Sequence, residues 1–146
     1  FNIFINKEKV NQKGLVLNDV KQKFKAFLLS QSFISNVFTE EEIQNSGSNN
    51  QLLEIISNGY DPKQNGELVL LFKPGFMEYS STGTTHGSPY SYDTHVPCLF
   101  YGWKIKKGES FNKKTITQIA PTLAQKLKIT MPNGTQSQVL EEVLNK

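Results

Sequence analysis

The chain has 146 residues, which is the size of one ordinary domain and enough to bury a hydrophobic core. Apolar residues make up 37% and charged residues 20%, which excludes a disordered protein, and no apolar run approaches the ~20 residues of a membrane-spanning helix. All sixteen basic residues are lysine and the net charge is only +3, so nucleic-acid binding is not expected. The single cysteine, Cys98, excludes an internal disulfide and a thiolate zinc cluster.

The acidic residues are unevenly divided, with ten glutamates and only three aspartates, beside two histidines. Two-metal hydrolytic sites draw many of their ligands from Asp and His, so this chain is not expected to build one alone. The sequence begins at Phe1 rather than Met, and residues 1–6 already have a strand pattern. We therefore expect that the chain is a single fragment cut from a larger protein.

The first 66 residues alternate between strand and helix patterns. Isoleucine and phenylalanine dominate residues 1–6 and indicate a strand. Asn18 can cap a helix whose apolar residues follow helical spacing, and Thr39 opens a capping box that predicts a short helix. The other predicted elements are a strand over 34–38, a loop over 45–50, a helix with Leu52, Leu53, Ile56 and Tyr60 that ends at Gly59, and a turn over 60–66.

The second part of the chain predicts two buried strands on either side of a long polar loop. The segment 67–72, ELVLLF, is apolar on consecutive positions after Glu67, which suits a strand buried on both faces, and residues 96–102 predict another buried strand. The loop between them covers Ser80 to Thr94. The remaining predictions are a resumed strand over 76–79, a helix capped by Thr117 with Ile119, Leu123 and Leu127, a turn over 131–134, and a final helix opened by a capping box at Thr135–Gln138.

This order of elements predicts an α/β or α+β fold with no internal repeat. If the chain has an internal boundary, we place it near the turn at 60–66. It would separate a βαβ-like front part, residues 1–66, from residues 67–146, which carry the long loop.

The long loop is the main candidate for a functional site, because loops at strand ends commonly carry chemistry in α/β proteins. His86 is flanked by small residues, so its imidazole can be approached closely and is suited to binding a metal. The alternative is that His86 is a solvated loop residue. We expect His95 to be a hydrogen-bonded structural residue beside a buried strand, and Asp93 to be a turn or cap residue.

Other reactive side chains have simpler explanations. Thr84, Thr85 and Ser88 could be nucleophiles only beside a base, and we expect them to make loop hydrogen bonds. Cys98 lies within a predicted strand and is expected to be a buried, inert thiol. Lysines in the stretch 103–114 could attract an anion, but we expect them to lie on the solvent-exposed edge of a hairpin and to discourage pairing with another strand. These residues are Lys104, Lys106, Lys107, Lys113 and Lys114.

Two segments resemble a known family. THGSPYSYDTHVPCLFYG, at 85–102, and TITQIAPTLAQKLKITMPNG, at 115–134, are similar to the C-terminal part of alkaline phosphatase superfamily enzymes, in particular the PafA-type alkaline phosphatases. The resemblance extends over nearly the whole chain. It implies the C-terminal portion of the alkaline-phosphatase-like fold, with a mixed sheet and flanking helices. It also implies that His86, in the T-H-G-S-P motif, is a ligand of one ion in a two-zinc site.

The resemblance implies a function for the complete protein. That function is hydrolysis of phosphate monoesters through a covalent phosphoenzyme, in the periplasm or outside the cell. The nucleophile and the other zinc ligands would lie in a missing N-terminal part, so the chain alone is expected to be inactive. Two alternatives remain open: a phosphodiesterase or nucleotide pyrophosphatase of the same superfamily, and a non-catalytic domain that lacks the catalytic half.

Overall fold

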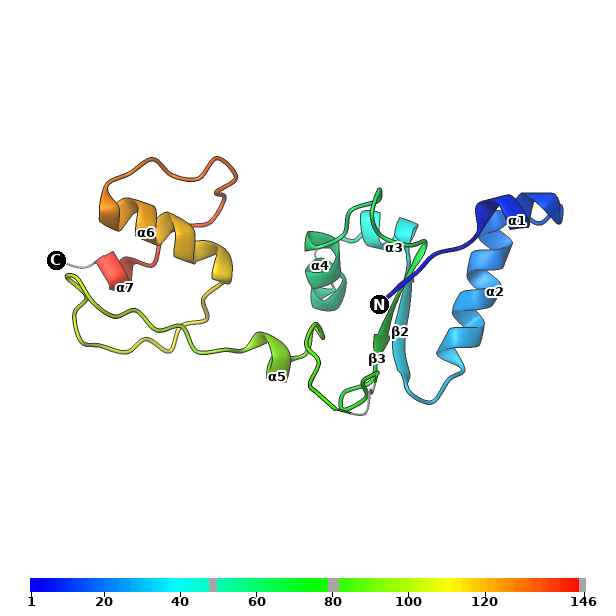
Figure 1. Cartoon of the computed structure of the whole chain (residues 1–146), viewed down its shortest axis with the longest axis horizontal. Helices are drawn as coiled ribbons and strands as arrows, with labels where there is room; N and C mark the ends of the chain where they lie inside the picture. The colour runs from blue at the N-terminus through cyan, green and yellow to red at the C-terminus, as the bar shows by residue number, and fades with distance from the viewer. Residues whose placement is uncertain (48–49, 79–81, 145–146) are drawn as a thin grey trace. The chain divides into compact units, whose positions relative to one another are not determined.

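The computed structural model describes residues 1–47, 50–78 and 82–144, and the chain divides into two compact units, Phe1–Val96 and Pro97–Lys146 (Figure 1). The first unit contains β1 (Asn2–Ile3), α1 (Lys7–Gln12), α2 (Leu17–Leu29), β2 (Ile34–Thr39), α3 (Glu40–Gln44), α4 (Gln51–Asn58), β3 (Leu68–Phe72) and α5 (Ser91–Thr94). The second unit contains the 3₁₀ turn η1 (Ile116–Gln118) and the helices α6 (Ile119–Leu127) and α7 (Glu141–Leu144).

The first unit is built on a three-stranded sheet in the order β1-β3-β2, with β3 in the centre and antiparallel to both neighbours. A register shift between Ile34 and Asn36 interrupts the pairing of β2 with β3. Such a bulge lets Ile34 and Val37 face the same side of the sheet, although they are three residues apart. The turn at 60–66 lies inside this unit, because the strand that follows it is the central one.

The central strand β3 is buried on both faces, as its continuous apolar sequence predicts. Leu68 and Leu70 belong to a core cluster on one face, and Val69 and Leu71 to a second cluster on the other. Helix α2 packs on the first cluster through Leu28, whereas α3 and α4 cover the second (Figure 1). The unit therefore consists of a small sheet between two helical layers.

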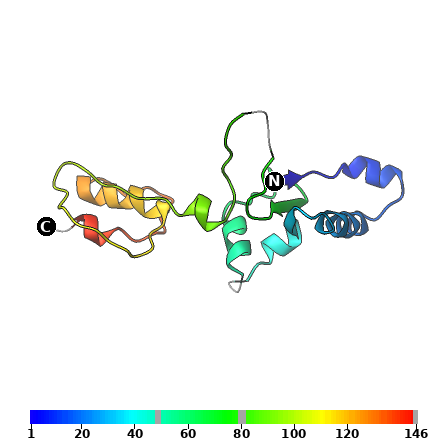
Figure 2. The same cartoon turned by 90° about the horizontal axis from the view of Figure 1, so that it is seen from below.

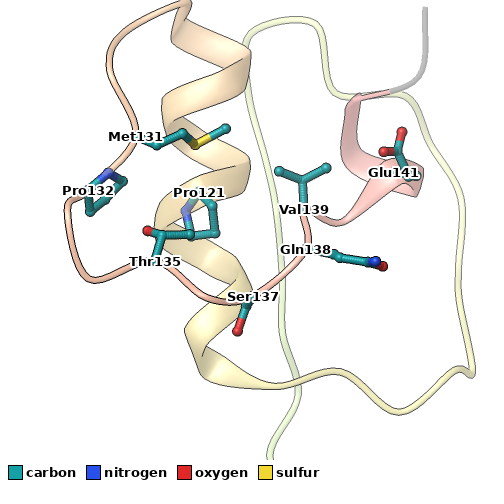
Figure 3. A pocket seen from close by; sticks show the side chains of 8 residues that line it. All are labelled: Pro121, Met131, Pro132, Thr135, Ser137, Gln138, Val139 and Glu141. Atoms are coloured by element: carbon teal, nitrogen blue, oxygen red, sulfur yellow. The ribbon is translucent and has the colours of Figure 1, made fainter.

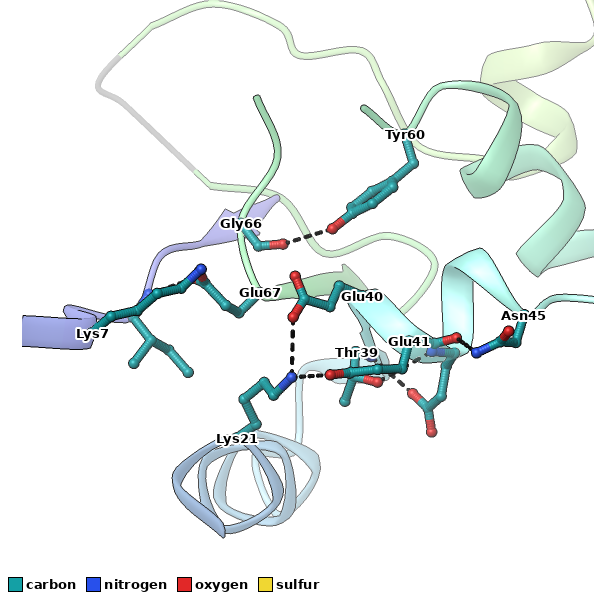
Figure 4. Close-up of polar contacts among 11 residues, drawn as sticks. Lys7, Lys21, Thr39, Glu40, Glu41, Asn45, Tyr60, Gly66 and Glu67 are labelled. Carbon is teal, nitrogen blue, oxygen red and sulfur yellow. Dashed lines mark hydrogen bonds and ion pairs between the residues drawn. The ribbon is translucent and has the colours of Figure 1, made fainter. Parts of the chain in front are cut away.

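An ion-pair network joins α2 to α3. The side chain of Lys21 is 4% exposed, and its ammonium group contacts Glu41 and, at 3.1 Å, Glu40 (Figure 4). One turn further along α2, Lys25 pairs with Glu42 at 2.5 Å. Burial alone would lower the pKa of Lys21, but the hydrogen bonds to Glu41 and Glu40 outweigh burial and raise it.

Most helix boundaries of the first unit follow the sequence signals. Thr39 forms the predicted capping box with Glu42, and Gly59 follows the last residue of α4. Two differences concern the segment before β2. Helix α2 begins at Leu17, so the predicted cap at Asn18 is wrong, and α1, capped by the Asn6 side chain, was not predicted.

The second unit is held together by side-chain contacts to the backbone around α6 and α7, which lie side by side (Figure 2). The buried hydroxyl of Thr122 donates to Gln118 O at 2.6 Å and accepts from Leu140 N at 2.8 Å. The ammonium group of Lys126 donates to Lys104 O at 2.9 Å and to Val143 O at 3.2 Å. These bonds connect α6 to the segment at Lys104 and to the segment from Leu140 to Val143. The described residues of this unit contain no β-sheet.

Three predictions for the second half of the chain are wrong. Residues 96–102 form no strand, and Leu99 and Tyr101 are 90% and 97% exposed, because no described strand pairs with them. The lysines of 103–114 do not lie on the edge of a hairpin, since the described residues of that stretch contain no strand. The capping box at Thr135–Gln138 opens no helix, and α7 begins only at Glu141.

Two further predictions need adjustment. Residues 76–78 do not resume the strand, and position 79 lies outside the described residues, as do 48–49 of the predicted loop. The cap of the helix after residue 115 is Thr115 rather than Thr117, and it opens η1, which leads into α6. The predicted α/β class with flanking helices is confirmed. The described sheet is not mixed, however, because β3 pairs antiparallel with both β1 and β2.

Candidate functional site

The polar loop that follows β3 is attached to the end of that strand. The Tyr90 hydroxyl donates a hydrogen bond of 2.6 Å to Phe72 O, at the last residue of β3. The carbonyl of Tyr90 in turn accepts from the backbone of Asp93 and Thr94, which forms the short helix α5. The loop thus returns to the sheet, and its second half is fixed relative to the buried strand.

The turn that carries His86 depends on glycine and on a carboxylate. Gly87 has φ +105, a backbone conformation that residues with a Cβ rarely adopt. The backbone N–H of the next residue, Ser88, donates to Asp93 Oδ2 at 3.1 Å, and the Ser88 hydroxyl donates to the same oxygen at 2.5 Å. Asp93 is therefore the turn residue that the sequence predicts, and it closes the segment from Ser88 to α5.

The His86 side chain is exposed at a cavity of about 160 Å³. Asp93 and Ser88 contribute polar lining, while aromatic side chains such as Tyr90 and Phe76 contribute apolar lining. Among the described residues, none forms a hydrogen bond with a ring nitrogen of His86. The imidazole can therefore offer a lone pair to a metal ion without giving up an existing partner.

The carboxyl group of Asp93 is held in its ionised form. Its pKa is lowered first by the hydrogen bond from the Ser88 hydroxyl and then by the bond from the Ser88 backbone. Ser88 acts here as a hydrogen-bond donor, which confirms the structural role expected for it. The Thr85 hydroxyl likewise makes a local contact, to His86 O at 3.5 Å.

Two predictions about neighbouring residues are wrong. His95 is exposed at the end of α5 and lies beside no described strand, so it is not the structural histidine that was expected. Cys98 is exposed rather than buried. Both errors have one cause, which is that the apolar run at 96–102 has no strand partner among the described residues.

The described residues contain no group of three or more His, Cys, Asp or Glu side chains that could hold a metal ion. A structural or catalytic zinc site needs at least three protein ligands, so His86 could supply only one of them here.

None of the described helices is long and apolar enough to cross a lipid bilayer.

A larger cavity, of about 560 Å³, lies in the second unit beside α6 (Figure 3). Its lining mixes apolar side chains, among them Pro121 and Met131, with the polar side chains of Thr135 and Gln138. Glu141 is its one titratable lining residue. Acid–base or metal chemistry needs more than one such group, so the His86 loop remains the better candidate.

Comparison with known proteins identifies relatives over the whole chain. Alkaline phosphatase PafA of Elizabethkingia meningoseptica is 33% identical over 147 residues, which cover all of this chain and 27% of that protein. A protein named calcium-transporting ATPase, from Myroides odoratus, is 43% identical over 95 residues, or 64% of this chain and 17% of that protein. No protein-family profile matches the chain.

Solved structures give the same result. The crystal structure of wild-type alkaline phosphatase PafA matches 99% of this chain with a TM-score of 0.89 and 33% identity, and the matched region is 28% of that structure. The chain thus spans between 17% and 28% of the length of these relatives, and its match lies in the C-terminal part of the alkaline phosphatases. The resemblance inferred from the T-H-G-S-P loop is confirmed.

Proposed function

Because the chain is homologous to the C-terminal part of alkaline phosphatases of the PafA type, we propose that it belongs to a zinc-dependent enzyme that hydrolyses phosphate monoesters. In this proposal the chain is the C-terminal part of that enzyme, and the reaction passes through a covalent phosphoenzyme. The nucleophile and the remaining zinc ligands come from the part of the protein that precedes this chain. The enzyme acts in the periplasm or outside the cell.

The observation that carries the proposal is the state of His86. Its imidazole is exposed at a cavity, has no hydrogen-bond partner among the described residues, and stands in the motif that the resemblance assigns to a zinc ligand. Neutral imidazole is the commonest nitrogen ligand of zinc. The residue therefore fits the metal as one ligand, and the rest of the coordination shell must come from outside the described residues.

The chain would contribute binding and orientation rather than bond-making chemistry. His86 would hold one ion through a ring nitrogen, and the turn closed by Asp93 would keep the imidazole in place. When bound, zinc supplies positive charge that stabilises the oxygens of the phosphoryl group in the transition state. With one ligand and no nucleophile beside a base, residues 1–146 alone are expected to show no phosphatase activity.

The experiment uses the complete protein, purified with its metal and then stripped with a chelator. We expect about two zinc ions per molecule, loss of aryl phosphate hydrolysis on stripping, and recovery when zinc is added back. Full activity of the stripped protein would contradict zinc dependence. Faster turnover of a bis-aryl phosphate or of ATP would replace the proposed monoester specificity, and a protein inactive on all three substrates would support the non-catalytic alternative.

A further inference from the structure

We propose that Asp93 is a positioning residue for His86, acting through the two hydrogen bonds that it accepts from Ser88. This inference rests on the proposed role of His86 as a zinc ligand and goes beyond it. It assigns a function to a residue that does not touch the metal. The chain of contacts runs from the buried strand β3, through Tyr90 and α5, to Asp93 and then to the turn that carries the imidazole.

The contacts between β3 and α5 fix the position of Asp93. Tyr90 is anchored by its 2.6 Å bond to Phe72 O, and its own carbonyl accepts from Asp93 N at 2.9 Å and from Thr94 N at 3.0 Å. One backbone carbonyl therefore orients two consecutive residues of α5. As a result, the Asp93 carboxylate has a defined place relative to the sheet, which is the most deeply buried part of the first unit.

The contacts between Asp93 and Ser88 in turn restrict the position of His86. Asp93 Oδ2 accepts both the backbone N–H and the hydroxyl of Ser88, so Ser88 is held at two atoms. Only Gly87, with φ +105, separates Ser88 from His86. Glycine has no Cβ to restrict its backbone, so without the two bonds to Asp93 the imidazole would sample more positions. A ligand held in one place binds metal more tightly than one that must be ordered on binding.

The charge of Asp93 reinforces these bonds. Hydrogen bonds to an ionised acceptor are stronger than those between neutral groups, and Asp93 Oδ2 accepts two bonds from Ser88. Partners of metal ligands commonly tune metal affinity by 10–100-fold.

Three variants of the complete protein separate geometry from charge. Asp93→Ala removes both acceptor bonds, Asp93→Asn keeps one neutral oxygen that can accept them, and Ser88→Ala removes only the hydroxyl. The control is Asp61→Ala, which also deletes a carboxylate that accepts a backbone bond within a turn, from Lys63 N at 2.9 Å, but lies outside the His86 loop. Zinc affinity is measured by competition with a chelator. The visible absorption spectrum of the cobalt-substituted protein reports the geometry around the ion, and thermal melting reports stability.

We expect Asp93→Ala to bind one zinc ion about 10–100-fold more weakly and to alter the cobalt spectrum. Asp93→Asn should recover most of the affinity, Ser88→Ala should fall between wild type and Asp93→Ala, and Asp61→Ala should bind zinc like wild type. Wild-type affinity and an unchanged spectrum in Asp93→Ala would overturn the proposal. Equal losses in Asp93→Asn and Asp93→Ala would also overturn it, because the hydrogen bonds that asparagine can still accept from Ser88 would then contribute nothing to zinc affinity.

If Asp93→Ala does not fold, Ser88→Ala decides the question, and wild-type zinc affinity in that variant counts against the positioning role. His86→Ala is measured in parallel to separate the two proposals. If His86→Ala keeps both zinc ions, the ligand assignment itself has failed. If His86→Ala loses zinc while the Asp93 variants do not, only the positioning role has failed.

Discussion

Replacing Lys21 tests how the helical layers are held to the sheet of the first unit. Lys21→Ala removes the buried ammonium group and three methylene groups of its stem, whereas Lys21→Met keeps an unbranched apolar side chain in the same space. The partners Glu40 and Glu41 are 28% and 51% exposed, so water can solvate them once the lysine is gone. The two variants therefore separate the ion pairs from the burial of the stem.

The expected magnitudes follow from these exposures. Loss of three buried methylene groups costs about 2 kcal/mol at ~0.8 kcal/mol each. Loss of the pairs adds about 1 kcal/mol, near the value for exposed pairs and below the 3–5 kcal/mol seen when a partner is left buried and unpaired. We expect Lys21→Ala to destabilise α2 by about 3 kcal/mol and Lys21→Met by about 1 kcal/mol.

The assay is amide hydrogen exchange in the complete protein, followed in peptides that cover α2. Since 1.4 kcal/mol corresponds to a tenfold change in an equilibrium, protection should fall about 100-fold in Lys21→Ala and about fivefold in Lys21→Met. Equal losses in the two variants would refute the importance of the buried stem. Unchanged protection in Lys21→Ala would show that Lys21 does not hold α2 in place.

Two further outcomes are expected. A Cβ on Gly66 would lie 2.2 Å from Ile3 O, so Gly66→Ala should separate β1 from β3 at a cost of about 1–3 kcal/mol and speed amide exchange at β1. The control is Gly108→Ala, where an added Cβ would have nothing within 4 Å and exchange at β1 should not change. Slow exchange at β1 in Gly66→Ala would contradict this prediction. The pKa of Glu41 is lowered, because its bond from Lys21 outweighs burial, so its stabilising effect is present above its ordinary pKa of 4.5 and is lost as pH falls through the folded value. The pKa of Lys21 is raised, so its contribution is present below its ordinary pKa of 10.5 and is lost as pH rises through the folded value; a melting-temperature profile that Lys21→Met leaves unchanged at both ends would refute this linkage.

The elements that the sequence predicts well are those whose partners lie within the chain. The strand predicted over 67–72 is β3 (Leu68–Phe72), which is apolar on both faces and pairs with both β2 and β1, so the pattern and the structure agree. The run at 96–102 has the same pattern but no described strand beside it, and Leu99 remains exposed. Hydrophobic pattern reports that residues favour burial but not which segment buries them. If the chain belongs to the longer enzyme proposed above, a segment outside residues 1–146 should cover this run.

The candidate site was only partly accessible to reasoning from residue types. Spacing alone makes His86 a loop histidine, and the family resemblance supplies its proposed role as a metal ligand. The bonds from Ser88 to Asp93 have no sequence rule that predicts them, although a small polar residue five positions before an aspartate in a glycine-containing loop is compatible with such a turn. Helix α1 could have been predicted, because Asn6 is a strong capping residue.

The assignment of His86 is tested most directly by comparing two histidine variants of the complete protein. His86 and His95 are both exposed and lie in the same loop region, so replacing either by alanine should leave the melting temperature of the metal-free protein nearly unchanged. With zinc bound, the melting temperature should fall only in His86→Ala, because a metal ion that binds the folded state stabilises it. His86→Ala should lose one zinc ion and reduce aryl phosphate hydrolysis by at least about 100-fold, beyond the 10–100-fold typical of losing an outer partner of a metal ligand. His95→Ala should keep both zinc ions and most of the rate. Full zinc content and full rate in His86→Ala would contradict the assignment.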